Sequence, residues 1–231
     1  MEKADTFDSV MDIVRTLRSE HGCPWDRVQT HESLERCMIE ETYEAVEGIH
    51  ILRDTGDGDN LCEELGDVVF HVAFHSVLAE EEGIFTAEDV FEGICKKMIH
   101  RHPHVFGRGQ DGEQKKALPD WEQLKQEEKK EKGDSRSEAE AVPRTFPALI
   151  RAMKVQKKLQ RSGLCEDVSL EQSCENARQK IDLLEAGAIA DNEKASELVG
   201  KLLYDICRIS AKYDIYPEEA LTDTIEDMVK G

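Results

Sequence analysis

Two stretches of the chain decide its fold: ESLERCMIEETYEAVEGIHILR (32–53) and NLCEELGDVVFHVAFHSVLAEEE (60–82). In both, apolar residues recur every three or four positions, the spacing that places side chains on one face of an α-helix. The segment RDTGDGDN (53–60) between them is rich in Gly and Asp, which favour turns. The pattern predicts two long helices joined by a short loop.

The same spacing extends to most of the chain. It predicts further helices at 5–20, 86–99, 146–161, 169–187, 191–213 and 217–229. Because no alternating strand pattern of any length occurs, the predicted fold class is an all-α helical bundle. The polar stretch 108–142 is predicted to be a charged linker between helical domains at 1–107 and 143–231.

An internal repeat relates the two predicted domains. The segment GDVVFHVAFHS (66–76) resembles GKLLYDICRIS (200–210), and FTAEDVFEGICKKM (85–98) resembles IYPEEALTDTIEDM (215–228). Self-similarity of this kind indicates two tandem copies of one helical unit.

Composition restricts the partners and the compartment. The 231 residues are 39% hydrophobic, too apolar for a disordered chain, and carry a formal net charge of −20, which repels nucleic acid and anionic membranes. The cysteines are odd in number and none has CxxC spacing, so reduced thiols in the cytoplasm are expected. No run of about 18 apolar residues and no signal-peptide core occurs, so no membrane association is expected.

Carboxylates lie where the helical pattern calls for apolar side chains. In the first helix the apolar stripe is completed by Glu41, with Glu44 at its margin and Glu40 further out. In the second helix Glu64 falls inside the stripe and Asp67 lies at its margin. The apolar members of the two stripes are Leu34, Met38, Ala45, Ile49 and Leu52 in the first helix and Leu61, Leu65, Val68 and Val72 in the second.

Converging buried carboxylates repel one another and lose hydration, and a bound divalent cation removes both problems. Oxygen ligands without a cysteine cluster favour Mg²⁺, or Mn²⁺, over Zn²⁺. Because Mg²⁺ on carboxylates keeps positions for substrate phosphates, the pattern indicates phosphate chemistry. His71 and His75 share the carboxylate face and are predicted to be core or supporting residues rather than metal ligands.

EETYE (40–44) followed by ELGD (64–67) resembles the EExxE…ExxD signature of the MazG nucleoside triphosphate pyrophosphohydrolases. CPWDRVQTHESL (23–34), KKMIHRHPHVFG (96–107) and PALIRAMKVQKK (147–158) are also similar to MazG sequences. The resemblance implies an all-α homodimer or higher homo-oligomer that hydrolyses nucleoside triphosphates to monophosphate and pyrophosphate. It implies Mg²⁺ ligation by the acidic positions of the signature, which here are Glu40, Glu41, Glu44, Glu64 and Asp67.

The resemblance also implies roles in catalysis and substrate binding. Either a metal ion or one glutamate, Glu41 or Glu44, would activate the attacking water. Lys97 and Arg101 match basic positions that hold phosphates. Trp121, in a segment shared with Lys125, either stacks on the base or anchors a loop to the core.

The second copy departs from the signature. Aligned by the repeat, its acidic positions read Arg178, Gln179, Asp182, Leu198 and Lys201, so four of five carboxylates are lost. Only the first copy is therefore expected to be catalytic, and the second to be structural, regulatory or a dimerisation domain. Two alternatives stay open: the same fold acting on a modified nucleotide or an alarmone, and a non-catalytic helical interaction protein with a vestigial site.

Overall fold

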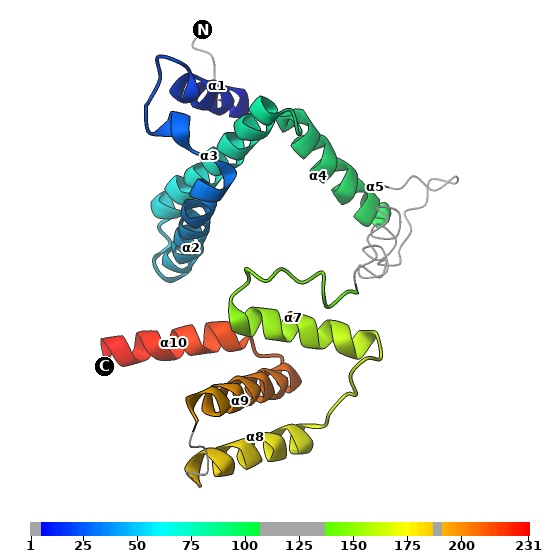
Figure 1. Cartoon of the computed structure of the whole chain (residues 1–231). Helices are drawn as coiled ribbons and strands as arrows, with labels where there is room; N and C mark the ends of the chain where they lie inside the picture. The colour runs from blue at the N-terminus through cyan, green and yellow to red at the C-terminus, as the bar shows by residue number, and fades with distance from the viewer. Residues whose placement is uncertain (1–5, 107–136, 187–190) are drawn as a thin grey trace. The chain divides into compact units, whose positions relative to one another are not determined.

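The computed structural model describes residues 6–106, 137–186 and 191–231, and these ranges contain helices and no strand (Figure 1). This confirms the predicted all-α fold class. The chain divides into two compact units, Met1–Lys125 and Gln126–Gly231. Within the described ranges no helix has both the length and the apolar character needed to cross a membrane. All seven cysteines are free thiols.

The first unit is organised around one long helical hairpin. Its elements are α1 (Phe7–Arg18), the 3₁₀ helix η1 (Asp26–Val28), α2 (His31–Thr55), α3 (Asp59–Glu82), α4 (Ala87–Arg101) and the short α5 (Pro103–Phe106). The hydroxyls of Thr30 and Thr86 cap α2 and α4 by accepting backbone N–H bonds from the first turn. Gly56, with φ of 77°, ends α2 in the left-handed conformation that favours glycine and allows the chain to turn into α3.

The core of the first unit lies on the C-terminal half of α3. There α3 packs against α1, against the beginning of α2 and against the start of α4. The buried apolar residues of this core are Met11, Val14, Leu34, Ala73, Phe74, Val77, Leu78 and Ala87. The N-terminal half of α3 packs against the remainder of α2, and this is where the acidic residues lie.

Several residues of the predicted apolar stripes are exposed rather than buried. Ile49 is 52% exposed and Leu65 is 51% exposed, and Met38 and Leu52 are also exposed. Part of each apolar stripe therefore faces away from the α2–α3 contact. The physical reason is that a two-helix hairpin covers only one side of each helix, so the far edge of each stripe has no cover in the described part of the first unit.

The second unit repeats the order of the first: a helix, a hairpin of two helices, and a final helix. These are α7 (Ala148–Arg161), α8 (Leu170–Glu185), α9 (Asn192–Lys212) and α10 (Pro217–Lys230), with α9 packed against the other three. The end of the predicted linker belongs to this unit, because Val142 is buried and Glu138 forms an ion pair with Lys158 (3.3 Å).

Candidate functional site

Three carboxylates of the first unit converge between α2 and α3. Glu41 comes from α2, and Glu64 and Asp67 come from consecutive turns of α3. Each offers one oxygen such that the three oxygens lie within 4.8 Å of one another. Glu41 and Glu64 are half-buried and Asp67 is exposed. This group of residues is the carboxylate cluster.

A glycine allows the two helices that carry the cluster to approach closely. A Cβ atom placed on Gly48 would lie 2.8 Å from the Cα of Leu61 and 3.0 Å from its backbone nitrogen. Real Cβ atoms do not approach backbone so closely, so only glycine fits this crossing point. Gly48 and the nearby buried Ala45 thus set the α2–α3 separation that brings Glu41 within reach of α3.

Asn60 supports the cluster from the first turn of α3. Its side-chain Nδ2 donates a hydrogen bond to Glu64 Oε1 (3.1 Å). The bond fixes the orientation of a carboxylate that would otherwise rotate freely. Sequence reasoning missed both Asn60 and Gly48, although an Asn four residues before a Glu on one helix is a recognisable signal for such a bond.

The electrostatics of the cluster favour a bound cation. Burial raises the pKa of Glu41, and the negative charges of Glu44, Asp67 and Glu64 raise it further. Burial also raises the pKa of Glu64, with Glu44 and Asp67 adding to the effect and the Asn60 hydrogen bond opposing it. Without a cation, the cluster therefore holds its negative charge at a free-energy cost.

The other two signature positions lie outside the cluster. Glu44 is exposed on α2, close enough to raise the pKa values of Glu41 and Glu64. Glu40 accepts a hydrogen bond from Arg36 Nε (2.8 Å) on the same helix. The five acidic residues thus separate into three that converge, one beside them, and one engaged by an arginine.

The histidines continue the face of α3 beyond Asp67. His71 is buried; burial lowers its pKa, and the negative charge of Asp67 partly offsets this. His75 and His31 share a hydrogen bond between their Nδ1 atoms (2.7 Å), and their rings stack. His75 thus ties the start of α2 to α3.

The predicted substrate-binding residues lie elsewhere. Lys97 and Arg101 are on α4, which begins at the end of α3 opposite to the cluster (Figure 1). Lys97 is half-buried. Trp121 and Lys125 lie outside the described residues.

The second unit has other residues at the positions that correspond to the acidic signature. When α8 is aligned with α2 by their N-cap residues, Ser169 and Thr30, Lys180 takes the position of Glu41. The same match pairs the buried Leu34 with the buried Ser173. The alignment of α8 with α2, here called the α8 register, thus differs by one residue from the alignment expected from the sequence.

In the new register, Glu40 and Glu44 correspond to Gln179 and Leu183. In α9, matching the buried His71 with the buried Asp205 pairs Glu64 with Leu198 and Asp67 with Lys201, as expected. All five carboxylates of the signature are therefore replaced in the second unit.

Comparison with known proteins agrees with this geometry. Residues 29–106, which include the whole cluster, match the family model of the MazG nucleotide pyrophosphohydrolase domain. The nucleoside triphosphate pyrophosphohydrolase/pyrophosphatase MazG of Thermotoga maritima is 38% identical over 226 residues, covering 97% of the chain and 83% of the relative. The nucleoside triphosphate pyrophosphohydrolase of Escherichia coli K12 is 36% identical over 219 residues, covering 93% and 81%.

A further relative is longer. The uncharacterised protein YabN of Bacillus subtilis is 41% identical over 220 residues, which cover 94% of the chain but 44% of YabN.

An all-helical unit with this cluster, matched to these relatives, defines an enzyme of the nucleoside triphosphate pyrophosphohydrolase class. Within that class the chain belongs to the MazG family, as the sequence motifs indicated.

Proposed function

We propose that the first unit hydrolyses nucleoside triphosphates to nucleoside monophosphate and pyrophosphate in a Mg²⁺-dependent reaction. The observation that carries this proposal is the convergence of Glu41, Glu64 and Asp67 between α2 and α3. The printed names of the Thermotoga and Escherichia relatives support the nucleoside triphosphate as substrate. The free thiols favour a reducing compartment such as the cytoplasm.

The residues of the cluster fit Mg²⁺ by charge and by ligand type. They provide carboxylate oxygens alone, the hard donors that Mg²⁺ and Mn²⁺ prefer. The raised pKa values of Glu41 and Glu64 support a positive charge at the centre of the site. When bound there, the metal would neutralise the triphosphate and polarise the phosphoryl oxygens.

Glu44 is the residue best placed to act as general base. It lies beside the cluster without belonging to the three converging ligands. Its carboxylate is therefore free to accept the proton of a water that attacks the α-phosphorus. General base catalysis by a positioned side chain typically increases the rate by a factor of about 10²–10⁴.

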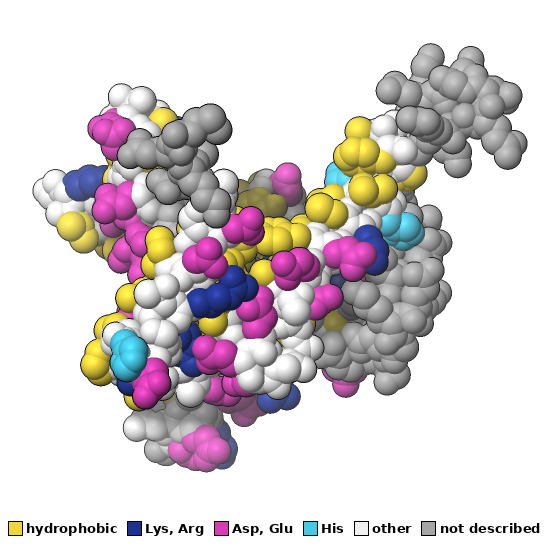
Figure 2. Space-filling model, turned by 90° about the horizontal axis from the view of Figure 1, so that it is seen from above, with side chains coloured by type: hydrophobic (Ala, Val, Ile, Leu, Met, Phe, Trp, Pro, Cys, Tyr) yellow, Lys and Arg dark blue, Asp and Glu magenta, His cyan; other side chains and the backbone are white. Residues whose placement is uncertain are grey.

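We further propose that the active protein is a homodimer. The uncovered edge of the hairpin exposes Ile49, Leu52 and Leu65, a stripe that a second copy of the hairpin would bury. Figure 2 shows hydrophobic side chains gathered among the many carboxylates of one face. In a dimer, α4 of the second copy would bring Lys97 and Arg101 to the phosphates, and their positive charge would stabilise the departing pyrophosphate.

The test is pyrophosphate release from ordinary and modified nucleotides, with Mg²⁺ and with EDTA. Glu44→Gln is expected to lower kcat by about 10²-fold or more while Mg²⁺ affinity stays close to wild type. Glu47→Gln, an exposed glutamate one turn along α2, is the matched control and should retain activity.

Three outcomes of this test go against parts of the proposal. Full activity of Glu44→Gln would exclude it as the base. A preference for modified nucleotides alone would reassign the substrate, and no hydrolysis of any nucleotide would indicate a non-catalytic interaction protein.

A further inference from the structure

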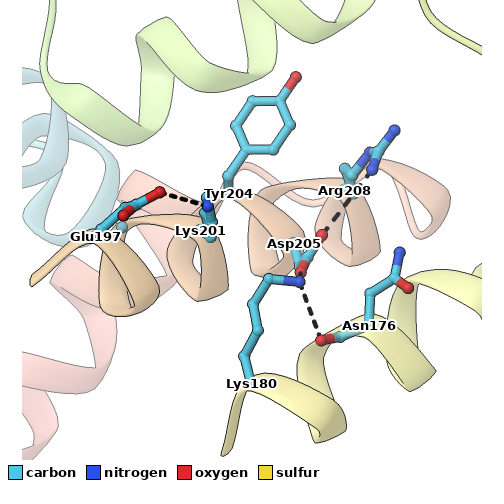
Figure 3. Close-up of a pocket in the computed structure, with 8 residues that line it drawn as sticks. Asn176, Lys180, Glu197, Lys201, Tyr204, Asp205 and Arg208 are labelled. Atoms are coloured by element: carbon cyan, nitrogen blue, oxygen red, sulfur yellow. Dashed lines mark hydrogen bonds and ion pairs between the residues drawn. The ribbon is translucent and has the colours of Figure 1, made fainter. Parts of the chain in front are cut away.

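An open cavity of about 440 Å³ lies between α8 and α9 in the second unit (Figure 3). Three of its lining side chains are cationic and two are carboxylates. The lining residues are Asn176, Lys180, Glu197, Gly200, Lys201, Tyr204, Asp205 and Arg208. In a chain of net charge −20, a lining with more cations than carboxylates is unusual and calls for a physical reason.

The cavity occupies the place that the carboxylate cluster occupies in the first unit. Lys180 stands at the position of Glu41 and Lys201 at that of Asp67. The buried Asp205 stands where the first unit has the buried His71. Lysines thus replace two of the three cluster carboxylates, and Leu198 replaces the third, Glu64. The second unit has therefore gained two positive charges at this place as well as losing the carboxylates.

The ammonium groups keep hydrogen-bonding capacity. Lys180 Nζ lies 2.5 Å from Asp205 Oδ2 and donates to the backbone carbonyl of Asn176 (3.1 Å). An ammonium carries three donors, so these two contacts leave one for a ligand. The ion pair also offsets the negative charge of Asp205, whose side chain is 5% exposed.

Two further cations extend the cavity along α9. Lys201 Nζ contacts Glu197 alone among the described residues (2.5 Å), and its side chain is 59% exposed, which leaves it free to turn toward a ligand. Arg208 lies one turn beyond Tyr204, with its NH1 3.9 Å from Asp205 Oδ1. Figure 3 shows Lys180 reaching from α8 toward α9.

We propose that this cavity binds a polyphosphate anion directly, without a metal ion. A chloride ion would engage one ammonium at a time. A ligand with several phosphate oxygens would accept donors from Lys180 on α8 and from Lys201 and Arg208 on α9 together. The ligand class includes free pyrophosphate and the phosphate chain of a nucleotide, either of which would make the second unit a sensor for product or substrate.

The test uses the full chain in EDTA, so that it is independent of hydrolysis and of the metal site. Binding of inorganic pyrophosphate is measured by titration calorimetry. Lys201→Gln is expected to weaken binding about tenfold, the effect of one charged hydrogen bond. Lys194→Gln, exposed on the same helix and not part of the lining, is the matched control and should bind within about twofold of wild type.

Further measurements identify the class of ligand and test whether it binds in the second unit. Titration with ATP and with orthophosphate separates a nucleotide from free pyrophosphate, and tighter binding of either polyphosphate than of orthophosphate supports the proposal. Lys180→Arg keeps the charge beside Asp205 and should still bind. Absence of binding in the wild-type chain would show that Lys180 is an internal counter-ion only. Weakening by Lys97→Gln with no weakening by Lys201→Gln would place the anion in the first unit, and either of these results overturns the proposal.

Discussion

Replacement of Gly48 by alanine tests whether the close approach of α2 and α3 builds the carboxylate cluster. The added methyl group would lie 2.8 Å from Leu61 Cα and 3.0 Å from both Leu61 N and Asn60 Oδ1. Two of these three atoms are backbone and cannot rotate away. The helices must therefore separate, and both Glu41 and the Asn60–Glu64 hydrogen bond move with them.

The expected loss of stability follows from two opposing effects. Overpacking of a helix crossing costs about 1–3 kcal/mol. Replacing a helical glycine by alanine recovers about 1 kcal/mol of helix propensity. The net loss is on the order of 1 kcal/mol, which lowers the melting temperature of a unit of this size by about 4 °C.

The assay is thermal unfolding in EDTA together with Mg²⁺ titration. Gly93→Ala on α4 is the matched control, because a Cβ at Gly93 meets no atom within 4 Å. It should gain about 0.5–1 kcal/mol. Gly48→Ala should also weaken Mg²⁺ binding about tenfold, since the ligand geometry is disturbed. A melting temperature for Gly48→Ala at or above wild type would refute the reasoning.

Three further predictions address charge, pH and assembly. Asp67→Asn is expected to abolish turnover and the rise in melting temperature that Mg²⁺ induces. In EDTA this variant should melt no lower than wild type, because repulsion among the carboxylates falls. Glu82→Gln on the same helix should behave as wild type in both buffers. The two cluster glutamates have folded-state pKa values above the ordinary 4.5, so protonation favours the folded state. In EDTA, the stability of the folded state should fall as pH rises above this value toward neutrality, and stabilisation by Mg²⁺ should grow over the same interval. Melting temperatures in EDTA and in Mg²⁺ that do not move apart as pH rises would contradict this prediction. Ile49→Lys is expected to reduce the mass measured by light scattering from dimer to monomer, whereas Glu47→Lys should not; a dimeric Ile49→Lys would place the interface elsewhere.

Periodicity alone singled out the residues of the carboxylate cluster. Glu41 and Glu64 were predicted because a carboxylate inside an apolar helical stripe needs an explanation whatever the tertiary structure. The helix limits also followed closely, since caps such as Thr86 and stops such as Gly83 act locally.

Other features depend on the packing of one element against another, which periodicity does not report. Gly48 matters only because Leu61 lies against it, and the exposure of Ile49 follows from how little of α2 its own chain covers. The register of α8 depended on loop lengths that differ between the repeats. The N-caps Thr30 and Ser169 fix this register in the structure.

The assignment of the chemistry to the first unit alone leads to a last prediction. All three cluster residues and the whole apolar core around α3 lie within Met1–Lys125. The second unit retains helix packing but has Lys180, Leu198 and Lys201 where Mg²⁺ would need oxygens. A fragment of residues 1–125 should therefore fold and release pyrophosphate from nucleoside triphosphates in the presence of Mg²⁺.

The matched control for this fragment is its Glu41→Gln variant, which should be folded and inactive. Circular dichroism, mass in solution and pyrophosphate release are measured on both. Because the fragment keeps the exposed stripe of α2, it should still dimerise if the hairpin forms the interface. A folded, dimeric fragment without Mg²⁺-dependent activity would show that the second unit supplies part of the active site, and the assignment of chemistry to the first unit alone would be wrong.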